Sequence, residues 1–280
     1  MKKAMMIISV FGLILAVPSE GSADIVSNLT GYWHLDGNGN DSSGHNNNMS
    51  TVYGTVTYDN NDKIGGTHSA RMGTSSAYGE MQAANSDTLK SAWEMTFSTW
   101  VKFDSVPTHY SKILNKWGGG TNGRLYQVYW DYNKSKFVFG LANSGNIGVY
   151  MDSDTISLQA DTWYHLVVTA KTDLSVGQPN AWMYLTPAGQ SNIMKIMETE
   201  WAPSDGNRAM NYYNTKPFII ASQYTDWQLE GKMDEVRYYQ RHLTESDVQE
   251  LYDAENIPEP TTMLVLASGV SSLLLRRRSK

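Results

Sequence analysis

The chain has no cysteine among its 280 residues. Disulfide bonds and thiolate metal centres are therefore excluded, and the fold must be held by core packing, with or without a metal bound by other ligands. Basic residues are also few: 22 Lys and Arg stand against 28 Asp and Glu, which gives a formal net charge of −6. This balance argues against nucleic acid as a partner.

Common catalytic motifs are missing as well. The sequence has no Gly-x-Ser-x-Gly, no His-Glu-x-x-His and no phosphate-binding loop. His165 alternates with Trp163 and Val167 in an apolar segment. That setting indicates a neutral, hydrogen-bonded core histidine rather than a general base. These features favour a binding or structural protein over an enzyme.

The first 23 residues have the pattern of a secretory signal peptide. Two lysines follow Met1, an apolar stretch runs from about Ala4 to Val17, and Gly21 and Ala23 stand at −3 and −1 of a cleavage site. We therefore expect residues 1–23 to direct export and to be removed.

The last residues form a second addressing pattern. An uncharged stretch over residues 261–275 is preceded by Pro258, Glu259 and Pro260 and followed by a basic tail, residues 276–280, with Arg276, Arg277 and Arg278. One interpretation is a plain membrane anchor, with the arginines on the cytoplasmic side. As a helix, however, the stretch would rise only about 22 Å, which is short of a hydrocarbon core of about 30 Å.

In order and content this tail, residues 258–280, resembles the PEP-CTERM sorting signal of bacteria. The resemblance implies recognition by an exosortase, transient contact of the 261–275 helix with the membrane, and cleavage near Pro258 to Pro260. It also implies delivery to the cell surface or extracellular matrix of a Gram-negative-type bacterium. A mature chain of residues 24–260 would lose six basic residues and one acidic residue, so its net charge would change from −6 to −11.

The region between the two ends predicts an all-β domain. Short segments alternate with period two, as in Met95 to Phe103, and Gly, Asn, Asp, Ser and Pro clusters separate them. About a dozen strands need two sheets. One short helix is predicted after Thr244, which can cap it together with Asp247, and we expect it at the edge of the sandwich. Residues 186–215 are expected to be irregular, and residues 253–257 to form a linker.

Five segments in order resemble the laminin-G-like group of concanavalin A-like jelly rolls. They are residues 31–44, 95–102, 111–114, 163–169 and 229–243. The resemblance implies a jelly-roll sandwich of two antiparallel sheets over residues 24–252, with the short C-terminal helix. Hydrolases on the same jelly roll carry a strand with Glu-x-Asp-x-x-Glu, which this chain lacks. Glu198 and Glu200 have the nearest spacing, without the intervening Asp.

Calcium is the one cofactor that the sequence suggests. The loop from Asp36 through Asn38 to Asp41 supplies oxygen ligands, and in related jelly rolls a structural calcium joins the N-terminal and C-terminal strands. Alternation places Asp234 on one face with Val236 and Tyr238, where an unpaired charge would be costly. A cation, a buried amide cluster or a basic residue of another strand would satisfy it. Turn-forming Asn and Asp residues explain the loop equally well without metal.

Aromatic residues are the candidates for ligand contact, because Trp and Tyr rings can stack on sugar faces. Trp117, Trp227 and Tyr224 stand beside turn-like residues, and Trp130 lies in an aromatic strand that also suits a core. The resulting hypothesis is a non-catalytic surface or matrix domain that binds a polysaccharide or surface glycan in adhesion. The alternatives are a structural matrix protein without a specific ligand and a polysaccharide-degrading enzyme.

Overall fold

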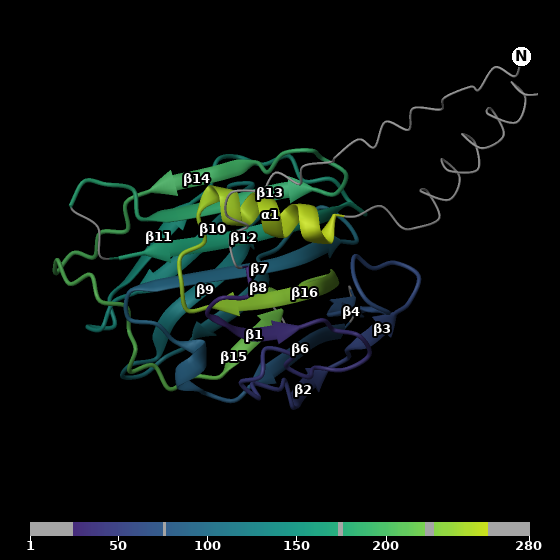
Figure 1. The fold of residues 1–280 in the computed structure, drawn as a ribbon, viewed down its shortest axis with the longest axis horizontal. Coiled ribbons are helices and arrows are strands. Elements are labelled where there is room, and N and C mark those ends of the chain that lie inside the picture. The colour runs from purple at the N-terminus through teal and green to yellow at the C-terminus, as the bar shows by residue number, and fades with distance from the viewer. Residues whose placement is uncertain (1–24, 75–76, 173–175, 222–226, 257–280) are drawn as a thin grey trace, which may run out of the picture.

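The computed structural model describes residues 25–74, 77–172, 176–221 and 227–256. It contains a sandwich of two antiparallel sheets with one α-helix, which confirms the fold predicted from the sequence (Figure 1). The signal peptide and the sorting tail lie outside the described residues. No helix in the described part of the chain is both long and apolar enough to cross a membrane.

The sheet beneath the helix, here called sheet A, has the strand order β14-β13-β12-β7-β16-β4-β3, with β1 also paired to β16. Its strands are β1 (Leu29–Trp33), β3 (Thr57–Asp59), β4 (Ser69–Arg71), β7 (Glu94–Phe103), β12 (Trp163–Lys171), β13 (Ala181–Pro187), β14 (Lys195–Thr199) and β16 (Gly231–Tyr239).

The opposite sheet, here called sheet B, has the order β11-β10-β9-β8-β15-β6-β2, with β5 paired to β6. Its strands are β2 (Thr51–Gly54), β5 (Gly73–Thr74), β6 (Ala77–Ala83), β8 (Ser111–Trp117), β9 (Arg124–Asp131), β10 (Lys136–Ala142), β11 (Gly148–Asp152) and β15 (Phe218–Ala221). A short 3₁₀ helix, Asp87–Leu89, precedes β7.

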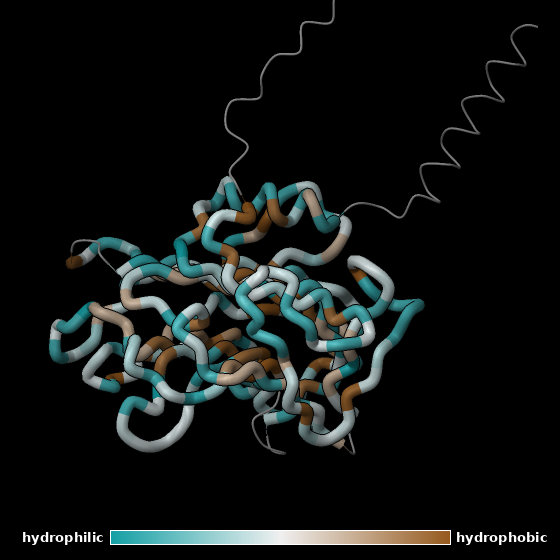
Figure 2. The backbone as a smooth tube through the Cα atoms, turned by 60° about the horizontal axis from the view of Figure 1, so that its bottom comes forward, coloured by the Kyte–Doolittle hydropathy of each residue, from teal (hydrophilic) through white to brown (hydrophobic). Residues whose placement is uncertain are grey.

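The core lies between the sheets, where the inward-facing apolar residues of the strands of both sheets meet (Figure 2). Phe97 of β7 stacks against Phe218 of β15 at 5.8 Å, and Trp33 of β1 stacks against the same ring at 5.1 Å. Aromatic rings of this size remove a large apolar area from water, which compensates for the missing disulfides.

The helix α1 (Glu245–Glu255) covers the outer face of sheet A rather than its edge. The expected capping box between Thr244 and Asp247 is present. Leu251 of the helix packs with Val167 of β12 and Tyr239 of β16. Trp100, which alternation directs away from the core, is fully buried on this side with Tyr252. The expected position at the sandwich edge is therefore wrong.

The helix also runs further than expected. Residues 253–255, which the sequence assigned to a linker, form its last turn. Glu255 is fixed there by an ion pair with Arg237 and by the Trp100 indole, whose Nε1 donates to Glu255 Oε2 at 2.6 Å. Residue 257 lies outside the described residues.

Strand β16 contains an irregularity that the sequence did not reveal. Its pairing with β7 shifts register between Asp234 and Arg237, and Glu235 has φ of +50°. Because of this bulge, Val236 faces the core while Asp234 faces the loop of residues 62–68. The prediction that Asp234 shares a face with Val236 and Tyr238 is therefore wrong, since alternation holds only in an unbroken strand.

The segment of residues 186–215 is more regular than expected. It contains β14, which pairs with β13 at the edge of sheet A and buries Ile196 and Met197. Beyond β14, Trp201 is fully buried and its Nε1 donates to the carbonyl of Leu141 at 3.0 Å. The segment therefore closes one end of the sandwich.

Candidate functional site

The solvent side of sheet B carries a row of side chains that crosses the strands. Residues directly opposite each other in an antiparallel sheet project from the same face. The register joins Gln82 to Ile219, Ile219 to Asn115, Asn115 to Gln127, and Gln127 to Gly140. Gln82 and Ile219 line a surface pocket, so the whole row belongs to the outer face. We call this row and the pocket beside it the binding face.

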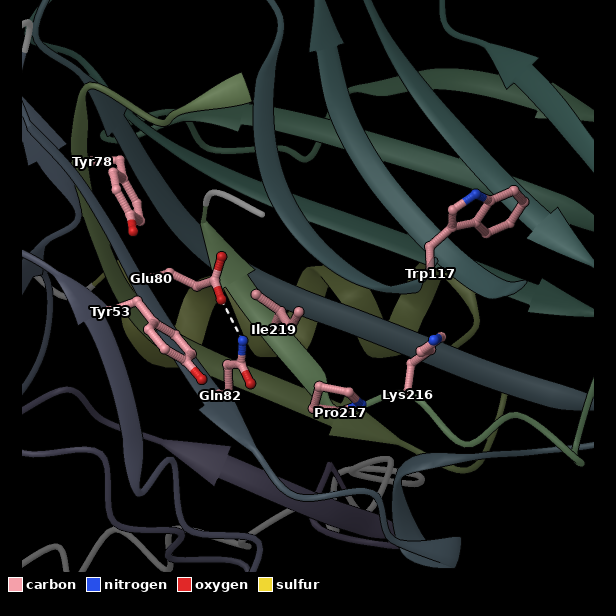
Figure 3. Close-up of a pocket in the computed structure, with 8 residues that line it drawn as sticks. All are labelled: Tyr53, Tyr78, Glu80, Gln82, Trp117, Lys216, Pro217 and Ile219. Atoms are coloured by element: carbon pink, nitrogen blue, oxygen red, sulfur yellow. Dashed lines mark hydrogen bonds between the residues drawn. The ribbon is translucent and has the colours of Figure 1, made fainter. Parts of the chain in front are cut away.

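The pocket on this face has a volume of about 330 Å³ (Figure 3). Figure 3 shows Tyr53 and Tyr78 at one end, Trp117 and Lys216 at the other, and Ile219 between them. The lining residues come from β2, β6, β8, β15 and the residues just before β15: Tyr53, Tyr78, Glu80, Gln82, Trp117, Lys216, Pro217 and Ile219. The lining of this hollow thus includes three aromatic residues and a few polar groups, and in Figure 3 the Trp117 ring points away from the two tyrosines.

Glu80 is the one carboxylate among the described residues that line this pocket. Gln82 Nε2 donates a hydrogen bond to it, and only 4% of the residue is exposed. Burial raises the pKa of Glu80. A carboxyl group can accept a hydrogen bond from a sugar hydroxyl group.

Asn115 occupies the centre of the row and is fully buried. Within the described residues, neither its Nδ2 nor its Oδ1 has a hydrogen-bond partner. Leaving a buried amide unsatisfied costs about 1–3 kcal/mol per group. Ser111 Oγ of β8 and Trp130 Nε1 of β9 are also buried without a partner among the described residues, so the unpaired amide of Asn115 does not by itself mark a binding site.

Lys112 stands at the other end of β8 from Trp117. Its Nζ donates to Gln127 Oε1 and lies 4.4 Å from the Trp227 ring and 5.1 Å from the Tyr129 ring. Trp227 in turn stacks on Tyr110 at 4.5 Å. The binding face therefore has an aromatic group at each end of β8, with the polar row between them.

The four residues predicted to contact a ligand have different positions. Trp117 lines the pocket, as expected of a ligand-contacting residue. It is the last residue of β8 rather than part of a flexible loop, and it is only 9% exposed because it packs beside Gly148 and Tyr150. Trp227 lies beside Lys112. Tyr224 falls outside the described residues.

Trp130 is a correction to the predicted site. It is 1% exposed and packs edge-on against Phe137 at 5.2 Å inside the core. The residue before it in β9, Tyr129, faces outward toward Trp227 instead. Trp130 therefore contributes to stability and cannot contact a glycan.

The sequence did not indicate most of the pocket. Tyr78, Glu80 and Gln82 lie on β6, whose small residues Ala77, Gly79 and Ala83 hide the alternation that identifies a strand. Lys216 comes into place only through the pairing of β15 with β6 and β8. The one available signal was the alternation of Gln127 and Tyr129 in the aromatic strand β9.

The proposed calcium ligands make hydrogen bonds to backbone amides. Asp41 accepts from the N–H groups of Tyr32, Ser43 and Asn47 at 2.8–2.9 Å. Asn38 accepts from the N–H of Asn40 at 2.9 Å and is exposed. These short-range bonds are the turn contacts that the alternative interpretation of this loop expects.

Asp36 and Asp234 hold the same loop, residues 62–68, from two sides. Asp36 Oδ1 accepts from the N–H groups of Thr67 and His68, and Asp234 Oδ2 accepts from those of Ile64 and Gly65. Burial raises the pKa of Asp234 to about 8, against the lowering effect of these amides.

No three His, Asp or Glu side chains in the described ranges are gathered closely enough to hold a metal ion. The carboxylates at this end of the sandwich are satisfied by amides, which is an arrangement that does not call for a cation. Calcium therefore stays a prediction.

The acidic residues considered for catalysis have structural partners. Glu198 pairs with Lys195, and Glu200 pairs with Arg208 while accepting from the N–H of Gly177. His165 is buried, and its Nε2 lies 2.7 Å from Ser98 Oγ. Burial lowers the pKa of His165 to about 3, so it is neutral, as the sequence indicated.

Known proteins share this architecture. The sequence profile described as "Concanavalin A-like lectin/glucanases superfamily" matches residues 74–177. The binding domain of Paraclostridial mosquitocidal protein 1 superimposes with a TM-score of 0.59 at 14% identity, over 82% of this chain and 53% of that chain. The binding domain of botulinum neurotoxin serotype G gives a TM-score of 0.56 at 15% identity, over 80% of this chain and 50% of that chain.

A third similar structure is domain 4 of AbnA, a GH43 extracellular arabinanase from Geobacillus stearothermophilus, in complex with arabinotriose. It superimposes with a TM-score of 0.57 at 19% identity, over 80% of this chain and 98% of that chain. The chain thus spans about half the length of the two toxin binding domains and nearly all of the arabinanase domain. No curated protein matches the sequence. At these identities the similarity shows the fold alone. The chain has the concanavalin A-like jelly-roll fold, and residues 74–177 are similar to the profile of that superfamily.

Proposed function

We propose that this protein binds glycans, without cleaving them, through the binding face of sheet B. The observation that carries the proposal is the pocket, whose lining combines Tyr53, Tyr78 and Trp117 with a few polar side chains. Sugar rings have apolar faces that stack on aromatic side chains and hydroxyl edges that pair with amides and carboxyl groups. The binding face offers both kinds of contact within one surface.

The carboxylates argue for binding rather than hydrolysis. Glycoside hydrolysis ordinarily uses two carboxyl groups on either side of the scissile bond. Among the described residues that line the pocket, Glu80 has no second carboxylate beside it. A lone acid paired with Gln82 suits recognition of a hydroxyl group.

The similar structures are consistent with this proposal. Two of them are toxin domains described as binding domains, and the third was solved with arabinotriose. A jelly roll of this kind is therefore a suitable scaffold for carbohydrate binding, although the ligands of those proteins do not transfer to this chain.

We further propose that the domain is exported, sorted by an exosortase and exposed at the cell surface or in the extracellular matrix. The signal-peptide pattern of residues 1–23 and the tail of residues 258–280 support this location. At that place a glycan-binding face would serve adhesion to a polysaccharide matrix.

A glycan array probed with residues 24–256 tests the proposal. We expect wild-type protein to retain a defined set of polysaccharides, and Tyr53→Ala to lose them with little change in thermal unfolding, because Tyr53 is 50% exposed. Trp93→Ala is the matched control: Trp93 is 53% exposed but lies next to β7 in sheet A. Absence of binding to any glycan would favour the structural-matrix alternative, and release of reducing ends from a bound polysaccharide would favour the enzyme.

A further inference from the structure

The Lys and Arg side chains of the two sheets differ in whether they have a carboxylate partner. All six Lys and Arg residues within the strands of sheet A have a carboxylate oxygen within 4 Å: Arg71, Lys102, Lys171, Lys195, Lys232 and Arg237. In sheet B and the residues just before β15, five cations of the described chain have no such partner: Lys112, Lys116, Arg124, Lys136 and Lys216. In a chain with a net charge of −6, this difference does not follow from a shortage of carboxylates.

Three of these cations surround the binding face. Lys216 lines the pocket beside Trp117, and the Arg124 guanidinium lies 5.8 Å from the Trp117 ring. Lys112 stands at the opposite end of β8. Trp117 and Lys112 are five positions apart on one strand, so roughly 16 Å separate the two cationic ends.

Lys112 is the most informative of the three because it is only 4% exposed. Its ammonium group contacts an amide oxygen of Gln127 and the faces of two aromatic rings, and no described carboxylate is within ion-pair distance. Burying a cation without a counter-charge is costly, and here burial lowers the pKa of Lys112 to about 7. A ligand anion placed against this nitrogen would restore the charge and form a desolvated pair.

Glu80 does not cancel this pattern. No lysine or arginine of the described residues lies within 4 Å of its carboxyl group, and burial together with the Gln82 contact shields it. The face therefore has cationic side chains at both ends, and between them lies one buried carboxyl group that is hydrogen-bonded to Gln82.

We propose that the glycan bound by this face is an acidic polysaccharide, whose carboxylate groups are read by Lys216 and Arg124 at one end of β8 and by Lys112 at the other. The separation of the two ends requires a polymer that presents acidic groups at intervals, rather than a single charged sugar. This inference rests on the proposed function and specifies the class of ligand for the same site.

The experiment compares three acidic polysaccharides, polygalacturonate, alginate and hyaluronan, each with its carboxyl-reduced, neutral form. Binding to residues 24–256 is measured by biolayer interferometry at low and at physiological ionic strength. We expect at least one acidic polymer to bind about tenfold tighter than its neutral form, and this preference to shrink as salt is added.

Two variants locate the effect, and a third controls it. Lys216→Gln removes a half-buried cation of the pocket and should reduce the preference for the acidic form severalfold without changing thermal unfolding. Lys112→Gln should do the same, with its folding checked by circular dichroism. Lys63→Gln is the control, because Lys63 also lacks a carboxylate partner among the described residues but lies in the loop that follows β3 of sheet A.

The outcomes separate this inference from the proposed function. The inference would be overturned if acidic and neutral forms bound equally. It would also be overturned if Lys63→Gln and Lys216→Gln reduced the preference for the acidic form equally. Glycan binding would stand in both cases. Failure of every glycan to bind would overturn both.

Discussion

Removing the side chain of Glu255 tests how the C-terminal helix is held to sheet A. The Glu255 carboxylate is 7% exposed, pairs with Arg237 and accepts a hydrogen bond from Trp100. Breaking one side of a buried ion pair costs about 3–5 kcal/mol. Because Arg237 keeps its contact with Glu235 at 3.0 Å, we expect Glu255→Ala to cost about 3 kcal/mol, the lower end of that range.

For a domain of this size, such a loss lowers the melting temperature by about 6–12 °C. The free energy is measured by urea unfolding, followed both by tryptophan fluorescence and by circular dichroism. Asp253→Ala provides the control, since Asp253 is exposed on the same helix and, among the described residues, its side chain accepts a hydrogen bond from Gln249. We expect the control to change stability by less than about 0.5 kcal/mol. Equal effects of the two variants would refute the assigned role of Glu255 in holding the helix to sheet A.

Three further predictions concern Lys112, calcium and the C-terminal tail. Burial lowers the pKa of Lys112 to about 7, from a value of 10.5 in the unfolded chain. The charged form of Lys112 therefore lowers the free energy of unfolding. This destabilisation is complete below pH 7 and disappears as the pH rises to 10.5. Lys112→Met should therefore stabilise the protein more at pH 6 than at pH 10 in urea unfolding, and an equal effect at both pH values would contradict the assigned burial. If calcium joins the Asp36–Asp41 loop to Asp234, EDTA should lower the melting temperature of the wild type by several degrees and that of Asp234→Ala by less. The reason is that a ligand at a hundredfold excess over its dissociation constant adds about 2.7 kcal/mol to the free energy of unfolding. Superimposable melting curves with and without EDTA would exclude the ion. Mass spectrometry of protein extracted from the native cell surface should find no peptide beyond about residue 260, whereas recovery of Arg276 to Lys280 would support a membrane anchor.

The sequence predicted the sandwich well because most of its strands are long and alternate cleanly. Met95, Phe97 and Val101 identify β7 without ambiguity, and the capping box at Thr244 identifies the start of the helix. Short or small-residue strands such as β5 and β6 carry little periodic signal, so alternation does not identify them. The bulge at Glu235 reversed the face of Asp234, because one extra residue inverts every alternation that follows.

The site was harder to predict than the fold, because it is assembled from strands that are distant in sequence. Tyr53, Gln82 and Ile219 become neighbours only through the order β8-β15-β6-β2. Trp130 was a misleading candidate, since an aromatic strand in a sandwich directs alternate rings to the core and to the surface, and only the packed structure shows which ring goes where. Trp117 lines the pocket because it ends a strand rather than because it belongs to a loop.

The most direct test of the central claim is a crystal structure of the domain with an oligosaccharide of whichever polysaccharide the array selects. Glycan binding through the binding face predicts density for sugar rings stacked on Tyr53, Tyr78 or Trp117, with hydroxyl groups toward the polar side chains that line the pocket. Density for the sugar over sheet A, or on loops away from sheet B, would contradict the account.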